Sequence, residues 1–201
     1  MSLITEAWPF ELSHTNQFVF YDNFLSKEQC IKFIKQNNQK KKKDKATVGD
    51  NKLNKKIRDC FTSWIGIDDK SLWFYNELVA KTIQANADYF KFDLWGLAEA
   101  LQFTHYIAPN NYYHSHLDMG FNKRIRKLSA VVMLSDPKDF NGGELCLYTG
   151  KNSETGKDYV VIEPKQGRIV FFPSYLLHKV NPITKGERFS LVAWFTGPNF
   201  K

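Results

Sequence analysis

The sequence has few cysteines and no long hydrophobic run, and each absence excludes a class of protein. The three cysteines, Cys30, Cys60 and Cys146, lie far apart and form no Cys-x-x-Cys pair. An odd, scattered set argues against a disulfide framework and a structural zinc site, and it fits a reducing compartment. No apolar stretch approaches the roughly 20 residues of a membrane span. Residues 1–9 lack the basic start and apolar core of a signal peptide. We therefore expect a cytoplasmic protein with no membrane partner.

Acidic residues are outnumbered, 21 to 28 basic residues, which gives a net charge of +7. Much of the excess lies in one run, residues 40–43 with Lys45. Such a run is typical of a solvated loop, and the alternative is an electrostatic contact with nucleic acid or an acidic partner. The hydrophobic share of 43% and the aromatic share of 15% argue against a largely disordered chain. A length of 201 residues suits one well-buried domain.

The first half of the chain is predicted to contain two helices. Residues 18–25 read as a short strand, and Ser26 with Gln29 three residues later forms a capping box that starts the first helix. This helix is expected to end near residues 37–38. Residues 54–64 have apolar positions at helical spacing, but a strand is the alternative. A second helix is expected from residues 69–71 to about Phe90, with a broad apolar stripe facing the core.

The second half of the chain consists of short apolar segments separated by glycine and proline turns, a pattern typical of a sandwich or a double-sheet jelly roll. Strands are predicted at residues 98–107, 112–117, 127–135, 144–149, 159–163, 168–172, 178–183 and 188–196. Pro182 suggests an edge position for segment 178–183, and residues 184–187 read as a turn. The predicted fold class is α+β, with a support region of helices and strands at 1–95 and a jelly-roll core of about eight strands at 96–201. The N-terminal helices are expected to pack on one sheet of that core.

His116 and Asp118 suggest a metal site. In a strand, residues i and i+2 share a face, so an imidazole nitrogen and a carboxylate oxygen can reach one metal ion. His178 is the best candidate for a third ligand. Two histidines and one carboxylate with open positions are the ligand set of non-haem Fe(II) oxygenases. The spacing alone is weak evidence, because a His-x-Asp pair is also a common surface feature. His114 shares the strand face of His116, so alternation does not decide which histidine is the ligand.

Arg188 follows His178 by ten residues, and we expect the two to lie on antiparallel neighbours joined by one turn. That arrangement would place the guanidinium deep in the pocket that His178 faces. A guanidinium binds a carboxylate through two parallel hydrogen bonds, and Ser190 on the same face could donate a hydroxyl to that carboxylate. The alternative for Arg188 is a surface ion pair with Glu187 or Asp136.

These residues and several longer segments together resemble the Fe(II)- and 2-oxoglutarate-dependent dioxygenases. The resemblance is to the prolyl 4-hydroxylase-like branch and in particular to the bacterial PKHD-type hydroxylases. The matching segments are residues 21–26, 102–106, 116–118, 128–137, 142–145 and 167–173, with Tyr113, His178, Pro182, Gly186, Arg188 and Trp194. The resemblance implies one dioxygenase domain, residues 1–201, with a double-stranded β-helix (cupin-like) core. It also implies that His116, Asp118 and His178 hold Fe(II), and that Arg188 pairs with the distal carboxylate of 2-oxoglutarate.

The resemblance further implies which residues surround the cosubstrate. Tyr106, Ser190 and Trp194 are expected to line its binding site, with core packing as the alternative for Trp194. Where some animal relatives carry a tyrosine hydroxyl directed at the cosubstrate, this sequence has Met133. The full set of hydrogen bonds to 2-oxoglutarate is therefore left open.

The residues expected at the substrate entrance are Tyr113, His114 and Arg124. Core packing is the alternative for Tyr113. His178 and Arg188 together select iron and a dicarboxylic keto acid over zinc, so His116 is the expected ligand and His114 a neighbouring or entrance residue. The basic loops at residues 40–50 and 121–127 are expected to flank the entrance.

The implied activity is that of an oxidoreductase that uses O₂. It would couple hydroxylation of a substrate C–H bond to decarboxylation of 2-oxoglutarate to succinate and CO₂, with ascorbate as an accompanying reductant. The expected substrate is a prolyl residue in a peptide or protein. The alternatives are another amino acid, a small molecule or a nucleobase, or a non-catalytic binding module with a vestigial site. The basic loops leave an acidic peptide or a nucleic acid as an alternative partner.

Overall fold

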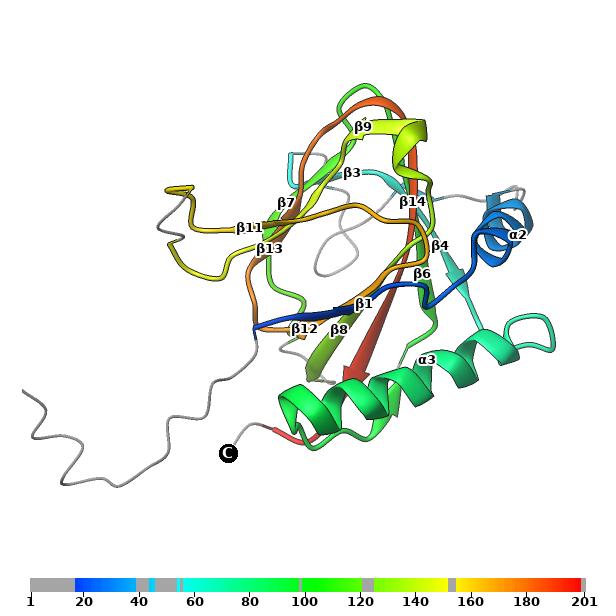
Figure 1. The fold of residues 1–201 in the computed structure, drawn as a ribbon, viewed down its shortest axis with the longest axis vertical. Helices are drawn as coiled ribbons and strands as arrows, with labels where there is room; N and C mark the ends of the chain where they lie inside the picture. The colour runs from blue at the N-terminus through cyan, green and yellow to red at the C-terminus, as the bar shows by residue number, and fades with distance from the viewer. Residues whose placement is uncertain are drawn as a thin grey trace, which may run out of the picture.

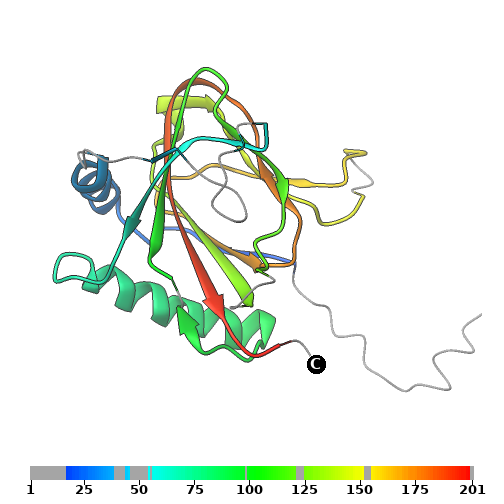
Figure 2. The ribbon, with the colours of Figure 1, turned by 180° about the vertical axis from the view of Figure 1, so that it is seen from behind.

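The computed structural model describes residues 17–38, 44–45, 54, 56–97, 99–120, 125–151 and 155–199. Within these residues the chain forms two β-sheets and two α-helices (Figures 1 and 2). The elements are β1 (Val19–Tyr21), α2 (Lys27–Asn38), β2 (Asp44–Lys45), β3 (Arg58–Asp59), β4 (Phe61–Ile65), α3 (Leu72–Ala85), the π-helix η1 (Asn86–Phe90), β5 (Gly96–Leu97), β6 (Leu101–Ile107), β7 (Tyr112–His116), β8 (Arg126–Met133), the 3₁₀-helix η2 (Pro137–Asp139), β9 (Phe140–Gly142), β10 (Leu145–Leu147), β11 (Val160–Ile162), β12 (Ile169–Pro173), β13 (His178–Val180) and β14 (Ile183–Thr196). In the part of the chain so described, no helix is long and apolar enough to cross a membrane.

The larger sheet has nine strands and the smaller sheet has five. The order in the larger sheet is β1-β12-β8-β14-β6-β4-β2, and β5 and β9 also pair with β14. The order in the smaller sheet is β11-β10-β13-β7-β3. Neighbours such as β8 and β14 come from distant parts of the chain and pair antiparallel, as in a jelly roll. The predicted α+β fold with a jelly-roll core is confirmed.

Strand β8 shows how the layers are built. Leu128, Ala130 and Val132 belong to the core that the larger sheet shares with the helices. Val131 and Met133, on the opposite face, belong to the core between the two sheets. Because successive side chains alternate between faces, a strand covered on both sides reads as one apolar run. That run made this strand recognisable from the sequence.

The helices pack on the larger sheet, as predicted. The backbone N–H of Gln29 donates to Ser26 Oγ at 3.2 Å, and the backbone N–H of Ser26 donates to Gln29 Oε1 at 2.7 Å. This capping box starts α2 where the sequence placed it. Helix α3 buries Phe74 and Leu78, and Figure 1 shows it running beneath the ends of β8 and β14. The second helix was expected to reach about Phe90; α3 ends at Ala85, and η1 completes the span.

Three local predictions are decided or corrected by the structure. Within the ambiguous segment 54–64, residues 58–59 form β3 and residues 61–64 belong to β4, so the strand alternative is the one observed. The edge position predicted for β13 is wrong, because β13 lies between β10 and β7 and Pro182 follows the strand without interrupting its hydrogen bonds. The turn predicted at 184–187 is also wrong, since these residues belong to β14. Gly186 has φ +74° there, and a Cβ at this position would collide with the carbonyl oxygen of Asp139. The glycine is therefore required within a paired strand and not in a turn, because Gly186 is the ladder partner of Phe140 in β9.

Strands β13 and β14 therefore belong to different sheets, not to one hairpin. The expectation that His178 and Arg188 lie on antiparallel neighbours is wrong. Their side chains instead approach the space between the sheets from opposite sides. The lysine run at 40–43 and Arg124 lie outside the described residues, and Lys45 is described only by its place in β2.

Candidate metal and cosubstrate site

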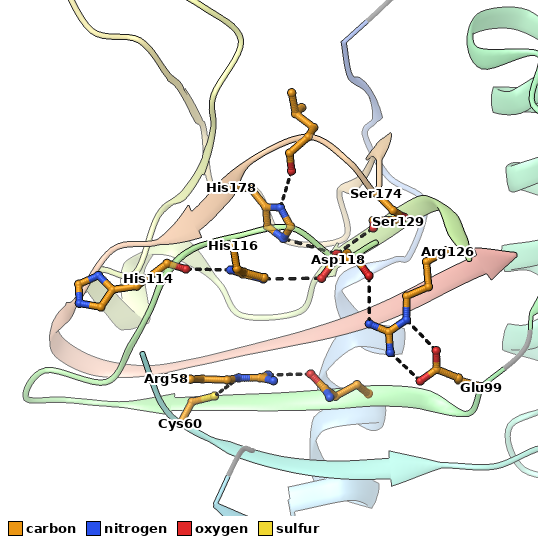
Figure 3. A network of polar contacts seen from close by, with 12 residues as sticks. Arg58, Cys60, Glu99, His114, His116, Asp118, Arg126, Ser129, Ser174 and His178 are labelled. Carbon is orange, nitrogen blue, oxygen red and sulfur yellow. Dashed lines mark hydrogen bonds and ion pairs between the residues drawn. The ribbon is translucent and has the colours of Figure 1, made fainter. Parts of the chain in front are cut away.

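Two adjacent strands of the smaller sheet bring the candidate metal ligands together (Figure 3). His116 ends β7 and His178 begins β13, and the two residues are direct partners across the ladder. Asp118 lies just beyond the end of β7, where its backbone N–H donates to the carbonyl oxygen of Ser174 at 2.9 Å. This bond anchors the chain after β7 to the segment that follows β12.

The ligand atoms converge on one point. His116 Nε2 lies 3.6 Å from Asp118 Oδ1, and His178 Nε2 lies 3.4 Å from Asp118 Oδ2. One ligand atom from each residue lies within 4.8 Å of the other two. Asp118 and His178 are buried, and His116 is partly exposed. The spacing matches what two imidazoles and one carboxylate need in order to share a metal ion.

The hydrogen bonds of the second ring nitrogens show which atoms are free to bind metal. His116 Nδ1 lies 2.8 Å from the carbonyl oxygen of His114, and His178 Nδ1 lies 2.9 Å from that of Leu176. A carbonyl oxygen only accepts, so each Nδ1 carries a proton. In neutral imidazoles the Nε2 lone pairs then face the Asp118 carboxylate. Three electron-rich groups at this distance repel one another unless a cation lies between them, so the donor set fits a divalent metal ion.

Burial and charge set the protonation of the ligands. Burial lowers the pKa of His178 to about 4, so its imidazole is neutral at neutral pH. Burial alone would raise the pKa of Asp118, but His178 and His116 outweigh it and hold this pKa well below its usual range. A neutral imidazole and an ionised carboxylate are the forms that bind metal.

Two serines and a tryptophan support Asp118. Ser129 Oγ donates to Asp118 Oδ2 at 2.8 Å and lies 2.8 Å from Ser174 Oγ, so the two hydroxyls form a buried chain ending on the carboxylate. The indole N–H of Trp194 is buried with no hydrogen-bond partner among the described residues. It nevertheless lies close enough to Asp118 to favour the charged carboxylate. These groups fix the orientation of the carboxylate.

Strand β14 presents Arg188, Ser190 and Trp194 on one face. Phe189 and Leu191, between them, point into the helix-side core, so alternation directs the other three toward the smaller sheet. Arg188 is 4% exposed, and its Nη1 donates to Ser190 Oγ at 3.3 Å. The predicted shared face of Arg188 and Ser190 is therefore present.

Arg188 has no carboxylate within ion-pair distance among the described residues. Glu187 contacts His105 at 2.8 Å and Asp136 contacts Lys27 at 3.6 Å instead, so the alternative of a surface ion pair for Arg188 is wrong. Burial lowers the pKa of Arg188 below its ordinary value. A buried cation without a counter-ion is costly and is suited to binding an anion.

Tyr106 lies directly across from Arg188 in the ladder between β6 and β14. The Arg188 Cζ is 5.4 Å from the centroid of its ring. Burial raises the pKa of Tyr106, so its hydroxyl stays protonated and able to donate. Met133 is also buried on the inner side of the larger sheet, and its thioether is only a weak acceptor.

The expected entrance residues differ in their surroundings. The Tyr113 ring stacks on the His116 imidazole, with centroids 3.5 Å apart and planes at 16°. His114 is exposed, and Figure 3 shows its imidazole pointing away from Asp118. Arg124 lies outside the described residues. Arg126, expected in the entrance loop, instead begins β8, donates from Nε and Nη2 to the Glu99 carboxylate at 2.7 Å each, and lies 3.9 Å above the Trp194 ring.

Several site residues were not singled out from the sequence. They are Arg58, Gln102, Ser129 and Ser174. Ser129 could have been noticed as a hydroxyl within the buried apolar run of β8, because a buried hydroxyl must find a partner. The other three depend on pairings between strands that are remote in sequence.

Comparison with known proteins agrees with this geometry. Residues 101–196 match the family model described as the 2OG-Fe(II) oxygenase superfamily. A PKHD-type hydroxylase of Idiomarina loihiensis is 33% identical over 95 residues, which cover 45% of this chain and 41% of that protein. The chain spans about half or less of the length of the curated relatives that it matches.

Solved structures share the fold over nearly the whole chain. A Pseudomonas putida prolyl-4-hydroxylase is 24% identical with a TM-score of 0.69, and the match covers 92% of this chain and 95% of that one. A Trichoplax adhaerens prolyl hydroxylase, in complex with a hypoxia inducible factor peptide fragment, is 21% identical with a TM-score of 0.76. That match covers 90% of this chain and 84% of the other. Residues 101–196, which carry all three candidate metal ligands and Arg188, are the part of the chain that is similar to the 2OG-Fe(II) oxygenase superfamily.

Proposed function

We propose that this protein is a 2-oxoglutarate- and Fe(II)-dependent hydroxylase. One observation carries the proposal. The protein combines a converged His116–Asp118–His178 set with a buried Arg188 guanidinium that has no carboxylate partner among the described residues. Trp194 connects the two parts, because it shares a face of β14 with Arg188 and lies beside Asp118. A metal site alone would fit many activities, and a buried arginine beside it selects a ligand that carries a carboxylate.

His116, Asp118 and His178 would hold Fe(II) through two Nε2 atoms and one carboxylate oxygen. Three protein ligands leave the remaining positions of the metal open to small molecules. Bound together, Fe(II), 2-oxoglutarate and O₂ supply the oxidising chemistry that hydroxylates a C–H bond, with succinate and CO₂ as co-products. Ascorbate is proposed as an accompanying reductant.

Arg188 would bind the distal carboxylate of 2-oxoglutarate and gain the counter-ion that it lacks in the free protein. Ser190 already accepts from the guanidinium at 3.3 Å and holds its orientation. The protonated hydroxyl of Tyr106 offers a further donor on the same side of β6. These three groups fix one end of the cosubstrate, which lets the metal ligands fix the other.

The remaining side chains would orient the ligands and exclude water. Ser129 holds one oxygen of Asp118 in place, so the carboxylate does not rotate freely. The core between the sheets, which includes Val131, Met133 and Phe172, supplies apolar walls. Such walls keep bulk water from a reactive centre.

For the substrate, we propose a prolyl residue in a peptide or protein. Two solved structures with this fold are of prolyl hydroxylases, and one of them holds a peptide fragment. Tyr113, His114 and Arg124 remain the residues proposed to meet the substrate. Tyr113 would do so through its edge and hydroxyl, because at least one face of its ring is covered by His116.

The test incubates the purified protein with Fe(II), 2-oxoglutarate, ascorbate and O₂, and with a peptide library. A matched library carries alanine in place of each proline. We expect the mass of proline-containing peptides to rise by one oxygen atom, with succinate formed in equal amount. Products on the proline-free library, on free amino acids or on oligonucleotides would overturn the prolyl assignment but keep the hydroxylase. No consumption of 2-oxoglutarate with any of these substrates would overturn the enzyme class.

A further inference from the structure

A stack of three side chains leads from β3 to the candidate metal ligand His116. The His116 imidazole lies nearly parallel to the Tyr113 ring, with centroids 3.5 Å apart. The Arg58 guanidinium lies over the same tyrosine ring, with Cζ 4.5 Å from its centroid. Two groups at these distances cannot share one face of a ring, so Tyr113 is held between them. Arg58 and Tyr113 are also direct partners in the ladder between β3 and β7.

Arg58 is fixed from the other side by hydrogen bonds. Its Nη2 donates to Gln102 Oε1 at 2.7 Å, and its Nε donates to Cys60 Sγ at 3.2 Å. These bonds are drawn in Figure 3, where Arg58 lies below His116 on the side away from His178. Gln102 lies on β6 of the larger sheet, and Cys60 lies in the link between β3 and β4, where the chain passes from the smaller sheet to the larger one.

The burial of Arg58 is costly. The residue is 7% exposed, and it has no carboxylate within ion-pair distance among the described residues. An amide oxygen and a thiol compensate a buried charge poorly. A neutral side chain would cost less to bury, so the presence of a charge here needs a reason. A flat cation that covers an aromatic face supplies that reason.

The stack restrains a motion that the hydrogen bond of His116 leaves free. The bond from Nδ1 to the carbonyl oxygen of His114 fixes one edge of the imidazole. It does not stop the ring from rocking about that edge, which would swing Nε2 away from Asp118. A ring packed flat against the imidazole does stop it. The position of Nε2 therefore depends on Tyr113, and the position of Tyr113 depends on Arg58.

We infer that Arg58 is a positioning residue for the metal site and acts through Tyr113 on His116. This inference rests on the proposed function, because it takes His116 as a metal ligand. Neighbours of this kind that orient metal ligands typically change metal affinity by about 10–100-fold when they are removed. Arg58 needs no contact with metal, cosubstrate or substrate for this role.

The test measures Co²⁺ binding to the metal-free protein by calorimetry and by the visible absorption spectrum of bound Co²⁺. Arg58→Gln and Tyr113→Leu should each weaken binding by about tenfold or more and should change the spectrum. Tyr113→Phe keeps the stacked ring and should keep both wild-type values. If Arg58→Gln fails to fold, Tyr113→Leu tests the same restraint.

Arg168 supplies a matched control. It is also buried and stacks on an aromatic ring, with Cζ 4.2 Å from the centroid of Phe20, but it lies immediately before β12, away from the triad. Arg168→Gln should leave the Co²⁺ affinity unchanged even though it costs stability. The double variant Arg58→Gln/Tyr113→Leu should lose no more Co²⁺ affinity than the weaker-binding single variant, because the two changes remove the same restraint on His116.

The inference is overturned if Arg58→Gln binds Co²⁺ as tightly as wild type, if Arg168→Gln loses as much affinity, or if the losses of the double variant add. A failure of the proposed function looks different. In that case wild type would bind no Co²⁺, or His116→Ala would bind it as tightly as wild type.

Discussion

Replacing Arg188 by methionine should stabilise the free protein and weaken its binding of 2-oxoglutarate. The guanidinium is 4% exposed and has no carboxylate partner among the described residues. If its role is to bind 2-oxoglutarate, the free protein bears the cost of burying it. Methionine has a similar length and no charge, so Arg188→Met removes that cost together with the binding group.

The magnitudes follow from the environment of the side chain. Burying one ion costs several kcal/mol after relaxation, and loss of the bond to Ser190, 3.3 Å long, gives back about 1.5 kcal/mol. The net stabilisation of the free protein is on the order of 1–3 kcal/mol, or a Tm roughly 2–12 °C higher for a chain of this size. Loss of a buried charge pair with 2-oxoglutarate costs about 2–5 kcal/mol, which weakens binding roughly 30-fold to several thousandfold.

Thermal unfolding with and without 2-oxoglutarate, in the presence of Mn²⁺, measures both effects. Without 2-oxoglutarate the Arg188→Met variant should melt roughly 2–12 °C above the wild type. At 100 times its wild-type Kd, 2-oxoglutarate should stabilise the wild type by about 2.7 kcal/mol and the variant by less than about 1 kcal/mol. Arg168→Met is the control, because Arg168 is equally buried but paired with Asp22 at 2.6 Å, and this variant should melt lower. The reasoning is refuted if Arg188→Met melts several degrees below wild type and still responds fully to 2-oxoglutarate.

Three further changes test separate parts of the structure. Ser129→Ala removes a 2.8 Å hydrogen bond to a buried carboxylate and should cost about 1.5–3 kcal/mol of unfolding free energy in denaturant titrations; an unchanged midpoint would contradict that bond. Hydrogen bonds from Arg168 and Lys165 lower the pKa of Asp22 to about 2, so the stability they provide is present above about pH 4 and is lost as the pH falls toward about 2. Asp22→Asn should therefore flatten the decline of Tm over that interval, and an equally steep decline would count against the pairing. Ser26→Ala removes the cap of α2 and should cost about 1 kcal/mol, measured in the same titrations, whereas no loss would show that the capping box is dispensable.

Patterns that depend on neighbours along the chain could be predicted from the sequence. The capping box of Ser26 and Gln29 marks the start of α2, and the apolar run of β8 marks a strand buried on both faces. The alternation of β14 places Arg188 and Ser190 on one face. Each of these signals is complete within a few residues, so no knowledge of strand pairing is needed.

Features that depend on strand pairing could not be predicted. Gly186 resembles a turn residue, but it takes its positive φ within β14, where it is paired with Phe140 of β9. The hydrogen bond between Arg58 and Gln102 joins positions 44 residues apart, and Arg126 pairs with Glu99 across 27 residues. Local sequence contains no information on which strands lie side by side, so these contacts became visible only in the fold.

The central claim is that His116, Asp118 and His178 hold the iron of a 2-oxoglutarate-dependent enzyme. The most direct measurement is the rate of succinate formation from 2-oxoglutarate by the Fe(II)-loaded protein, compared with Asp118→Ala. The carboxylate lies 3.4 and 3.6 Å from the two imidazole nitrogens, so its removal should dismantle the metal site. We expect succinate from the wild type and none above background from Asp118→Ala. Equal succinate formation by the two proteins would contradict the assignment.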